Sequence, residues 1–288
     1  MLSAIRFAVK EMEPASTKNR NREAPTFANI NLLGRCNADC YFCLGKDIAE
    51  LLSKHDQCKV HFSEWRDFDR FLELCRRAGI SKLYITGQNT DSLLYAHLGE
   101  LVDTLQASGF QVGLRTNGLL ALRSLDVINR CQLETGYTIE SLDAETTRQI
   151  MGIRRAPNWQ SIIPATARPR VQIVITRYNA DEFDAIVRYV ASFPNVKYMQ
   201  VRRVSTDTRL AELQPDIDAY EILYTKIARC HPLSRRLWSD AEEYILHGLP
   251  CVFWRTVRTS INSYNYFTDG TIATEYFVVE GYLKNYAR

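Results

Sequence analysis

Short apolar runs alternate with amphipathic segments between residues 27 and 204 of this 288-residue chain. The runs have the length and the β-branched or aromatic residues of strands, and the segments place apolar residues at helical spacing, as Phe68, Phe71 and Cys75 do. This alternation predicts an α/β fold with helices outside a parallel sheet, and six strand–helix units make a partial (β/α)6 barrel. The predicted strands are residues 27–33, 82–86, 111–115, 136–142, 171–176 and 197–204, and the predicted helices are residues 63–78, 94–107, 122–129 and 181–192.

The pattern changes after residue 205. Asp269-Gly270 is a strong hairpin-turn signal, because an Asp-Gly pair tolerates the positive φ angles of tight turns. The tail is predicted to contain helices and then strands, at residues 215–228, 239–246, 252–257, 260–267 and 271–279. The chain therefore divides into a flexible lead-in, a barrel core, and a C-terminal extension of helices and a β-hairpin that covers the open side of the barrel: residues 1–26, 27–205 and 206–288.

Cys36, Cys40 and Cys43 follow the first predicted strand at C-x3-C-x2-C spacing. Three thiolates on one tight loop can hold three irons of a cubane [4Fe–4S] cluster, which leaves one iron open to a substrate or cofactor. A zinc site is the alternative. Zinc prefers four ligands, usually in paired C-x2-C knuckles, and His55 and His61 are poorly spaced to complete such a set.

The composition limits the setting of this chemistry. The net charge of +3 gives no strong electrostatic case for nucleic acid. No apolar stretch approaches the length of about 18 residues that a membrane span needs, so no membrane association is expected. The first residues do not have the pattern of a secretory signal. The eight cysteines are therefore expected to be reduced thiols in a cytoplasmic protein.

The cysteine spacing, with the aromatic Phe42 directly before the last cysteine, resembles the radical S-adenosylmethionine (SAM) superfamily. The resemblance covers roughly residues 27–205. It implies one [4Fe–4S] cluster on Cys36, Cys40 and Cys43, with SAM bound at the fourth iron. It further implies reductive cleavage of SAM to a 5′-deoxyadenosyl radical, hydrogen abstraction from a substrate, and an electron donor such as flavodoxin or ferredoxin.

In such a barrel, ligands bind at the carboxyl ends of the strands, where polar residues recur in this sequence. Residues 87–90 stand where the family has a GGEP stretch, but Gln88-Asn89-Thr90 replaces its second glycine, glutamate and proline. Arg177 follows the fifth predicted strand, where its guanidinium could pair with the SAM carboxylate. For residues 87–90 a plain polar strand-to-helix turn is the alternative. The candidate SAM contacts are Phe42, Thr86, Gly87, Gln88, Asn117, Glu140, Ser141, Asp143 and Arg177.

Arginines near the strand ends are candidates for substrate binding. Arg202 and Arg203 are consecutive in a strand and point to opposite faces, so only one is expected inside the barrel. A charge in the interior is costly unless it is paired, so it would anchor a carboxylate or phosphate of the substrate. Arg154 is a third candidate, and a solvated surface position is the alternative for each.

The two cysteines of the tail, Cys230 and Cys251, are too isolated in the sequence to predict a second cluster. The hairpin after Cys251 resembles the twitch or SPASM-type extension of the family with its cluster cysteines lost. Cys251 is a candidate for returning a hydrogen atom to the product, and burial as a small apolar residue is the alternative.

The substrate is open at this point. The overall pattern resembles peptide-modifying and natural-product-tailoring members, whereas the short stretch before the first strand leaves a small polar or anionic metabolite equally possible. A nucleotide-modifying radical SAM enzyme is an alternative. A non-catalytic iron–sulfur or zinc scaffold is another, and the altered Gln88-Asn89-Thr90 stretch supports it. Nucleic acid is the least expected partner.

Overall fold

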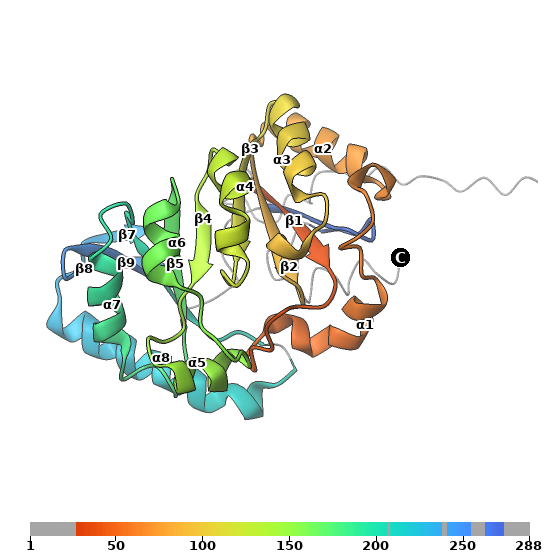
Figure 1. Cartoon of the computed structure of the whole chain (residues 1–288). Coiled ribbons are helices and arrows are strands. Elements are labelled where there is room, and N and C mark those ends of the chain that lie inside the picture. The colour runs from red at the N-terminus through yellow and green to blue at the C-terminus, as the bar shows by residue number, and fades with distance from the viewer. Residues whose placement is uncertain (1–26, 207, 238–240, 255–262, 274–288) are drawn as a thin grey trace, which may run out of the picture.

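The computed structural model describes residues 27–206, 208–237, 241–254 and 263–273. In this part of the chain one sheet contains 11 strands (Figure 1). Its centre is made of six parallel strands that lie side by side in chain order. They are β1 (Phe27–Leu33), β2 (Lys82–Gln88), β3 (Gln111–Thr116), β4 (Thr135–Thr138), β5 (Pro169–Ile175) and β6 (Met199–Arg203). The predicted α/β fold with a partial barrel is confirmed. The lead-in predicted for residues 1–26 lies outside the described residues.

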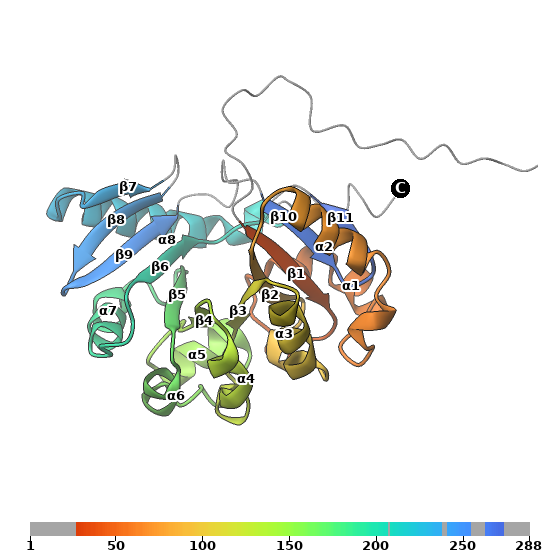
Figure 2. The same ribbon diagram turned by 90° about the horizontal axis from the view of Figure 1, so that it is seen from above.

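Helices cover the convex side of the sheet, which Figure 2 shows as an open arc. Each helix turns one apolar face inward, as the buried Phe68, Phe71 and Cys75 of α2 illustrate. The helices on this side are α2 (Phe68–Arg77), α3 (Leu98–Ala107), α4 (Leu125–Arg130), α6 (Trp159–Ala165) and α7 (Phe183–Ala191). Short 3-10 helices precede or interrupt several of them: η1 (Leu44–Ile48), η2 (Phe62–Glu64), η3 (Ser92–Leu94) and η4 (Ala121–Arg123).

Three further helices lie toward the carboxyl ends of the central strands, where Figure 1 shows them near the arrowheads of β1 and β4. They are α1 (Ala49–Lys54), α5 (Ala144–Met151) and α8 (Leu210–Cys230). The helix predicted at residues 215–228 is the central part of α8. No helix in the described part of the chain is both long and apolar enough to cross a membrane.

The prediction of a helix at residues 239–246 is wrong for the residues described there. Ala241–Leu246 form β8, which pairs antiparallel with β9 (Leu249–Trp254), and β9 pairs parallel with β6. His247 and Gly248 make the tight turn between β8 and β9, with φ angles of 48° and 80°. This two-residue turn with positive φ is the hairpin signal that outweighed the helix-favouring glutamates of β8. A short strand, β7 (Arg235–Leu237), pairs with β8 at the sheet edge.

The hairpin predicted around Asp269-Gly270 is present in the described residues. β10 (Ser263–Phe267) and β11 (Ile272–Ala273) pair antiparallel, and β10 pairs parallel with β1. The described strands of the tail therefore extend the sheet at both of its ends. Whether the tail forms a separate unit that covers the barrel stays a prediction.

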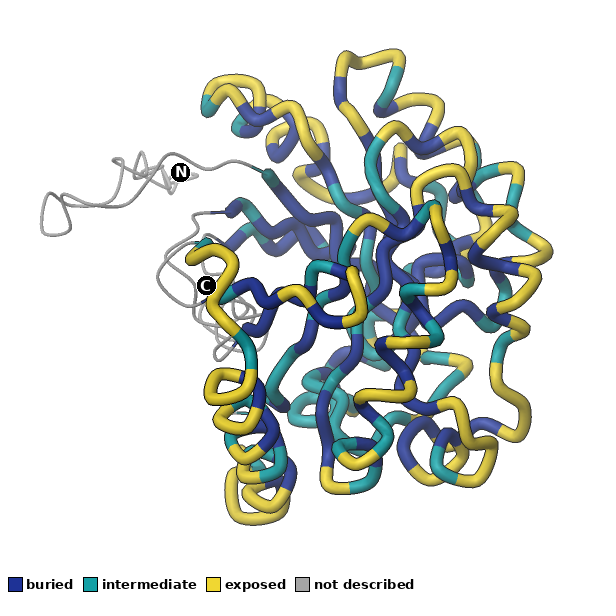
Figure 3. The backbone as a smooth tube through the Cα atoms, turned by 90° about the vertical axis from the view of Figure 1, so that its left-hand side faces the viewer, coloured by how far each residue is buried: buried dark blue, intermediate teal, exposed yellow. Residues whose placement is uncertain are grey.

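The two faces of the central strands differ in character. Val171, Ile173 and Ile175 of β5 are buried in the main apolar core, whereas Gln172 and Val174 face the inside of the barrel and border a cavity. Figure 3 shows the buried backbone concentrated in the strands and the exposed backbone in the outer helices and loops. The period of two in each strand thus separates a packed outer face from an inner face that is free to carry chemistry.

Candidate functional site

The loop after β1 carries the three motif cysteines and is held by many backbone contacts. The backbone N–H groups of Asp39 and Tyr41 donate to carbonyls at the end of α5, at 2.7 and 3.1 Å. The Arg209 guanidinium donates to the carbonyl oxygens of Tyr41 and Cys43, both at 2.7 Å, and to Oδ1 of the buried Asp47 at 2.6 Å. Arg209 therefore fastens the loop to the start of α8, a role that the sequence did not reveal.

Two residues of the unusual Gln88-Asn89-Thr90 stretch also hold this loop. The Asn89 amide donates to the Gly34 carbonyl at 3.2 Å, and the Thr90 hydroxyl donates to the Arg35 carbonyl at 3.0 Å. Asn89 adopts a φ of 55°, a conformation that asparagine tolerates better than most residues. Part of the departure from the family pattern thus has a structural role at the entry to the cysteine loop.

A buried carboxylate organises the other side of the loop. Asp91 accepts hydrogen bonds from the Thr116 hydroxyl at 2.8 Å and the Asn117 backbone N–H at 2.7 Å. The Asn117 side chain then donates to Asn37 Oδ1 at 2.7 Å and lies 3.7 Å from Cys36 Sγ. Burial raises the pKa of Asp91, and its hydrogen bonds from Asn117, Leu93 and Thr116 oppose that rise. Asn117, predicted as a SAM contact, therefore also positions the cysteine loop.

A cavity of about 290 Å³ opens beside this loop and is enclosed by the inner faces and carboxyl ends of the strands. Its lining is rich in amides and hydroxyls, some of which bond to one another, as Gln172 Nε2 does to Thr138 Oγ1 at 2.8 Å. Most of the residues predicted from the sequence to bind cofactor or substrate are brought together here: Cys40, Phe42, Cys43, Thr86, Gly87, Gln88, Asn117, Glu140, Arg202 and Arg203.

Glu140 is a buried carboxyl group in the cavity wall. It is 2% exposed, and its Oε2 accepts from the Val174 N–H at 3.1 Å, while Oε1 has no partner among the described residues. Burial raises the pKa of Glu140 to about 8, and the Val174 N–H lowers it slightly. At neutral pH this carboxyl is therefore mainly protonated and can donate a hydrogen bond to a ligand.

Cys36 is not among the residues that line the cavity, and four other predicted residues also lie away from that lining. The Ser141 hydroxyl donates to Glu182 Oε2 at 2.6 Å, and Asp143 caps α5 by accepting from the Thr146 N–H at 2.8 Å. Arg177 lies over the Tyr178 ring at 5.1 Å and 3.7 Å from Asp216 Oδ1. Arg154 is exposed. The contacts of Ser141, Asp143 and Arg177 account for the positions of these side chains without a ligand. The roles of all four residues toward SAM or substrate stay predictions.

Cys251 also lies away from the cavity. It is fully buried on β9 and packs in the main apolar core with Phe253, whereas Val252 and Trp254 of the same strand form a second cluster with Tyr198. Burial raises the pKa of the Cys251 thiol to about 12. The structure thus matches the packing alternative for Cys251, and hydrogen return by this thiol stays a prediction.

Arg202 and Arg203 both border the cavity, although only one was expected to face it. Arg203 is the last residue of β6 and lies at the rim, where its Nη1 is 3.4 Å from Glu221 Oε1 on α8. Arg202 precedes it and lies beside Val174 of β5 in the strand register. The end of the strand lets the two neighbouring side chains approach one opening from different sides.

The donor set of the loop fits an iron–sulfur cluster with one open iron. Burial raises the pKa of Cys36 to about 11 and also raises the pKa values of Cys40 and Cys43, so without a metal these thiols stay protonated. Metal ligation deprotonates such thiols outright. Three soft ligands on one loop suit iron–sulfur ligation, and the described cavity lining contains no fourth cysteine or histidine to complete a zinc site.

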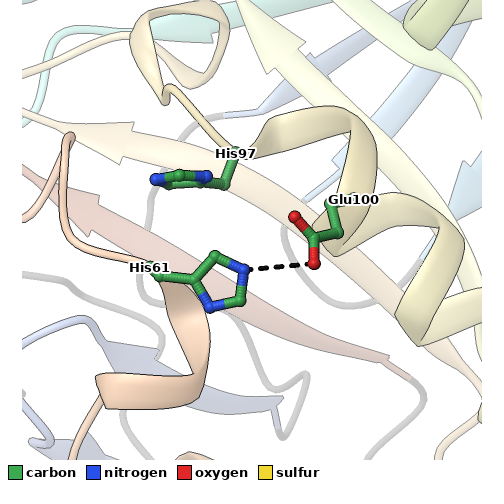
Figure 4. A group of neighbouring side chains, drawn as sticks. All are labelled: His61, His97 and Glu100. Carbon is green, nitrogen blue, oxygen red and sulfur yellow. Dashed lines mark ion pairs between the residues drawn. The ribbon is translucent and has the colours of Figure 1, made fainter.

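A second group with metal-ligand side chains lies outside the cavity lining (Figure 4). The ligand atoms of His61, His97 and Glu100 lie within 4.8 Å of one another. However, His61 Nδ1 accepts from the Ser63 N–H at 3.3 Å to cap η2, which places the ring proton on Nε2, the atom 3.2 Å from Glu100 Oε1. His61 thus caps η2 and contacts Glu100 of α3, and these interactions account for the close approach of the three side chains without a metal ion. α2 begins after the predicted start at residue 63, because the chain is extended at Trp65 and has a positive φ of 58° at Asp67.

This chain is similar in sequence or in fold to several known proteins. No family model matches the chain. It is 25% identical over 252 residues to GTP 3′,8-cyclase of Thermodesulfovibrio yellowstonii, covering 80% of this chain and 72% of that protein. Streptococcus suis SuiB bound to S-adenosylmethionine matches with a TM-score of 0.58 and 14% identity, over 86% of this chain and 60% of SuiB. SuiB bound to its precursor peptide SuiA matches with a TM-score of 0.60 and 12% identity, over 90% of this chain and 61% of SuiB. The chain thus spans about three fifths of the length of SuiB.

SuiB and GTP 3′,8-cyclase are radical SAM proteins, and the resemblance to that superfamily predicted from the cysteine loop is confirmed. The fold is thus a partial barrel, and the likeness to an enzyme, GTP 3′,8-cyclase, supports the class predicted from the sequence, the radical SAM enzymes. Enzymes of this class use a [4Fe–4S] cluster and SAM, in agreement with the predicted cofactors.

Proposed function

We propose that this protein reductively cleaves SAM at a [4Fe–4S] cluster on Cys36, Cys40 and Cys43 and directs the resulting radical to a substrate in the barrel. The observation that carries the proposal is the position of the loop: Cys40 and Cys43 border the same cavity as the inner faces of the strands. When bound, the cluster and SAM supply a 5′-deoxyadenosyl radical that abstracts a hydrogen atom.

The chain's own residues position and shield this chemistry. Arg209, Asn89 and Asn117 fix the loop through the contacts described above. Gly87 and Gln88 border the cavity, and Gln88 Nε2 donates to Asn31 Oδ1 at 3.0 Å; carbonyl and amide oxygens of these residues would suit an ammonium group of SAM. The mainly neutral Glu140 carboxyl can donate a hydrogen bond to an oxygen of the cofactor. Enclosure by the strands keeps water away from a radical.

For the substrate, we propose a peptide or natural product, in a biosynthetic role with flavodoxin or ferredoxin as the electron donor. The support is the likeness to SuiB, which was crystallised with its precursor peptide. The protein is proposed to be cytoplasmic, where its eight free cysteines would stay reduced.

Two alternatives have support from particular observations. The likeness to GTP 3′,8-cyclase, together with Arg202 and Arg203 at the cavity, favours a nucleotide as the substrate. The departure of Gln88-Asn89-Thr90 from the family pattern favours a scaffold that binds a cluster without cleaving SAM. The structural role found for Asn89 and Thr90 weakens this second alternative.

Anaerobic reconstitution followed by SAM and dithionite tests the proposal. The wild-type protein should form 5′-deoxyadenosine, and a Cys230→Ser variant, changed at the exposed end of α8, should form it equally well. A fully iron-loaded wild-type protein that forms no 5′-deoxyadenosine, with or without a panel of peptides and nucleotides, would support the scaffold instead.

A further inference from the structure

Three arginines meet inside the barrel. Arg170 near the amino end of β5 is 5% exposed, and Arg115 of β3 and Arg202 of β6 border the cavity closer to the carboxyl ends. Arg115 and Arg170 both pair in register with Gly136 of β4, so they lie on two sides of one glycine. Burial lowers the pKa of Arg170 most, the charges of Arg115 and Arg202 lower it further, and Tyr198 and Tyr84 oppose this shift.

The fold makes room for these side chains. A Cβ atom at Gly136 would lie 2.3 Å from Nη2 of Arg170, so a larger residue there would displace the guanidinium. The guanidinium of Arg115 lies over the Tyr84 ring, 5.1 Å from its centroid. Stacking on an aromatic face fixes the plane of a guanidinium and leaves its N–H edge available for a ligand.

The positive charge in this part of the barrel lacks matching negative charge. Nε of Arg115 is buried without a hydrogen-bond partner, and neither Arg115 nor Arg202 forms an ion pair within the described ranges. Arg203 and Arg209, by contrast, pair with Glu221 and Asp47. Arg115 and Arg202 are half-buried, and a guanidinium that is partly removed from water without an acidic partner is unfavourable, so the two residues are candidates for binding an anion.

Among the described residues, neither of the two nearby carboxyl groups, Glu134 and Glu140, forms an ion pair with Arg115 or Arg202. Glu134 accepts a hydrogen bond from the Tyr84 hydroxyl at 3.2 Å, and Glu140 is mainly neutral because of its burial. Two buried acceptors inside the barrel, Asn29 Oδ1 and Gln172 Oε1, also have no partner in the part of the chain that the structure describes. A ligand that carries both an oxyanion and a hydrogen-bond donor would satisfy both kinds of group.

We propose that Arg115 and Arg202 bind a carboxylate or phosphate group of the substrate inside the barrel. Guanidinium groups match the planar geometry of these oxyanions with two parallel hydrogen bonds. The anion would fix one end of the substrate deep in the cavity and leave the reacting carbon toward the cysteine loop. This inference rests on the proposed function, since it assigns the substrate's anchor in the same cavity.

Isothermal titration calorimetry of the cluster-loaded protein under anaerobic conditions, in a phosphate-free buffer of low ionic strength, tests the proposal. Inorganic phosphate and succinate serve as probes for the two oxyanions, and at least one should bind. Arg115→Gln and Arg202→Gln should each weaken that binding by about tenfold or more, because each removes a charged pair of hydrogen bonds. Arg202→Lys keeps the positive charge but lacks the two parallel N–H donors of a guanidinium. Its affinity for the probe should therefore lie between those of the wild type and Arg202→Gln.

Arg70→Gln, at an exposed position of α2, is the matched control and should bind as wild type does. Circular dichroism melting establishes whether each variant folds. If Arg202→Gln does not fold, the affinity of Arg202→Lys is compared with that of the wild type instead. The proposal is overturned if neither probe binds, if the double variant Arg115→Gln/Arg202→Gln binds as wild type does, or if saturating SAM displaces the probe, since the site would then serve SAM.

The two proposals can fail separately. A protein that forms 5′-deoxyadenosine but binds neither probe keeps the proposed function and loses the anion site. A protein that binds a probe through Arg115 and Arg202 but never cleaves SAM keeps the anion site and loses the radical function.

Discussion

The outer and inner faces of the central strands serve different purposes. On β5, Ile173 points outward and is fully buried under the helices, while the adjacent Gln172 points inward and borders the cavity. On β3, Leu114 and Arg115 show the same contrast. The apolar outer face holds the helices against the sheet, and the inner face can carry polar and charged groups because it does not have to pack a core. Stability and chemistry are thus encoded in alternate residues of the same strands.

The largest effect is expected at the cysteine loop. Cys40→Ala removes one of three thiolate ligands beside the cavity, so the protein should lose most of its cluster and all cleavage of SAM. Iron and sulfide analysis after anaerobic reconstitution measures this, with Cys230→Ser as the control. Normal iron content and brown colour in Cys40→Ala would show that the loop does not hold the cluster.

The contrast between the two faces predicts that alanine substitutions at two neighbouring residues of β5 lower the free energy of unfolding by different amounts. Ile173→Ala leaves a cavity in the packed outer core and should lower the free energy of unfolding by about 2–5 kcal/mol. Gln172→Ala on the inner face should change it by less than about 1 kcal/mol. Urea denaturation followed by circular dichroism measures both free energies of unfolding. Equal decreases at the two positions would show that the two faces of β5 do not differ in packing.

The buried carboxyl of the inner face should make stability depend on pH. Burial raises the pKa of Glu140 from 4.5 to about 8, so between these values the native state binds more protons than the unfolded state. The free energy of unfolding should therefore fall as the pH rises from 5 to 8, by no more than about 5 kcal/mol. Glu140→Gln cannot ionise and should remove this part of the slope.

Denaturation of the metal-free protein at several pH values gives the comparison between Glu140→Gln and wild type. Parallel curves for the two proteins would mean that the Glu140 carboxyl is already ionised in the native state at pH 5.

The smallest effect is expected at His61, on the outer side of the molecule. His61→Ala removes the cap of η2 and an exposed contact to Glu100, and it should cost about 0.5–1.5 kcal/mol. Cobalt(II) or zinc(II) in the buffer should not change the melting temperature of the cluster-loaded wild type through this group. A metal-dependent rise that His61→Ala abolishes would show that the trio binds metal after all.

The sequence predicts the central sheet well because the outer face imposes a regular apolar pattern. It also predicts the cysteine loop, whose spacing is local. The helix predicted for residues 239–246 is wrong for the described residues, Ala241–Leu246, which form a strand that ends at the tight His247-Gly248 turn. Arg115 is not among the site residues predicted from the sequence, although its alternation with Leu114 in the predicted strand is a signal for the inner face.

Other site residues have no comparable local signal. Arg209 and Asp91 hold the cysteine loop from positions far along the chain, and only the folded arrangement brings them to it. The same is true of the arginines in the barrel. Each is an ordinary residue in its own strand, and their shared position inside the barrel arises from the register across β3, β4, β5 and β6.

Electron paramagnetic resonance of the reduced cluster, with and without SAM, tests the central claim most directly. A cluster with three cysteine ligands and one open iron beside the cavity should give one [4Fe–4S]+ signal, and the g-values of this signal should shift when SAM is added. A reduced cluster whose spectrum is unchanged by saturating SAM would contradict the claim, since its irons would then be closed to the cofactor.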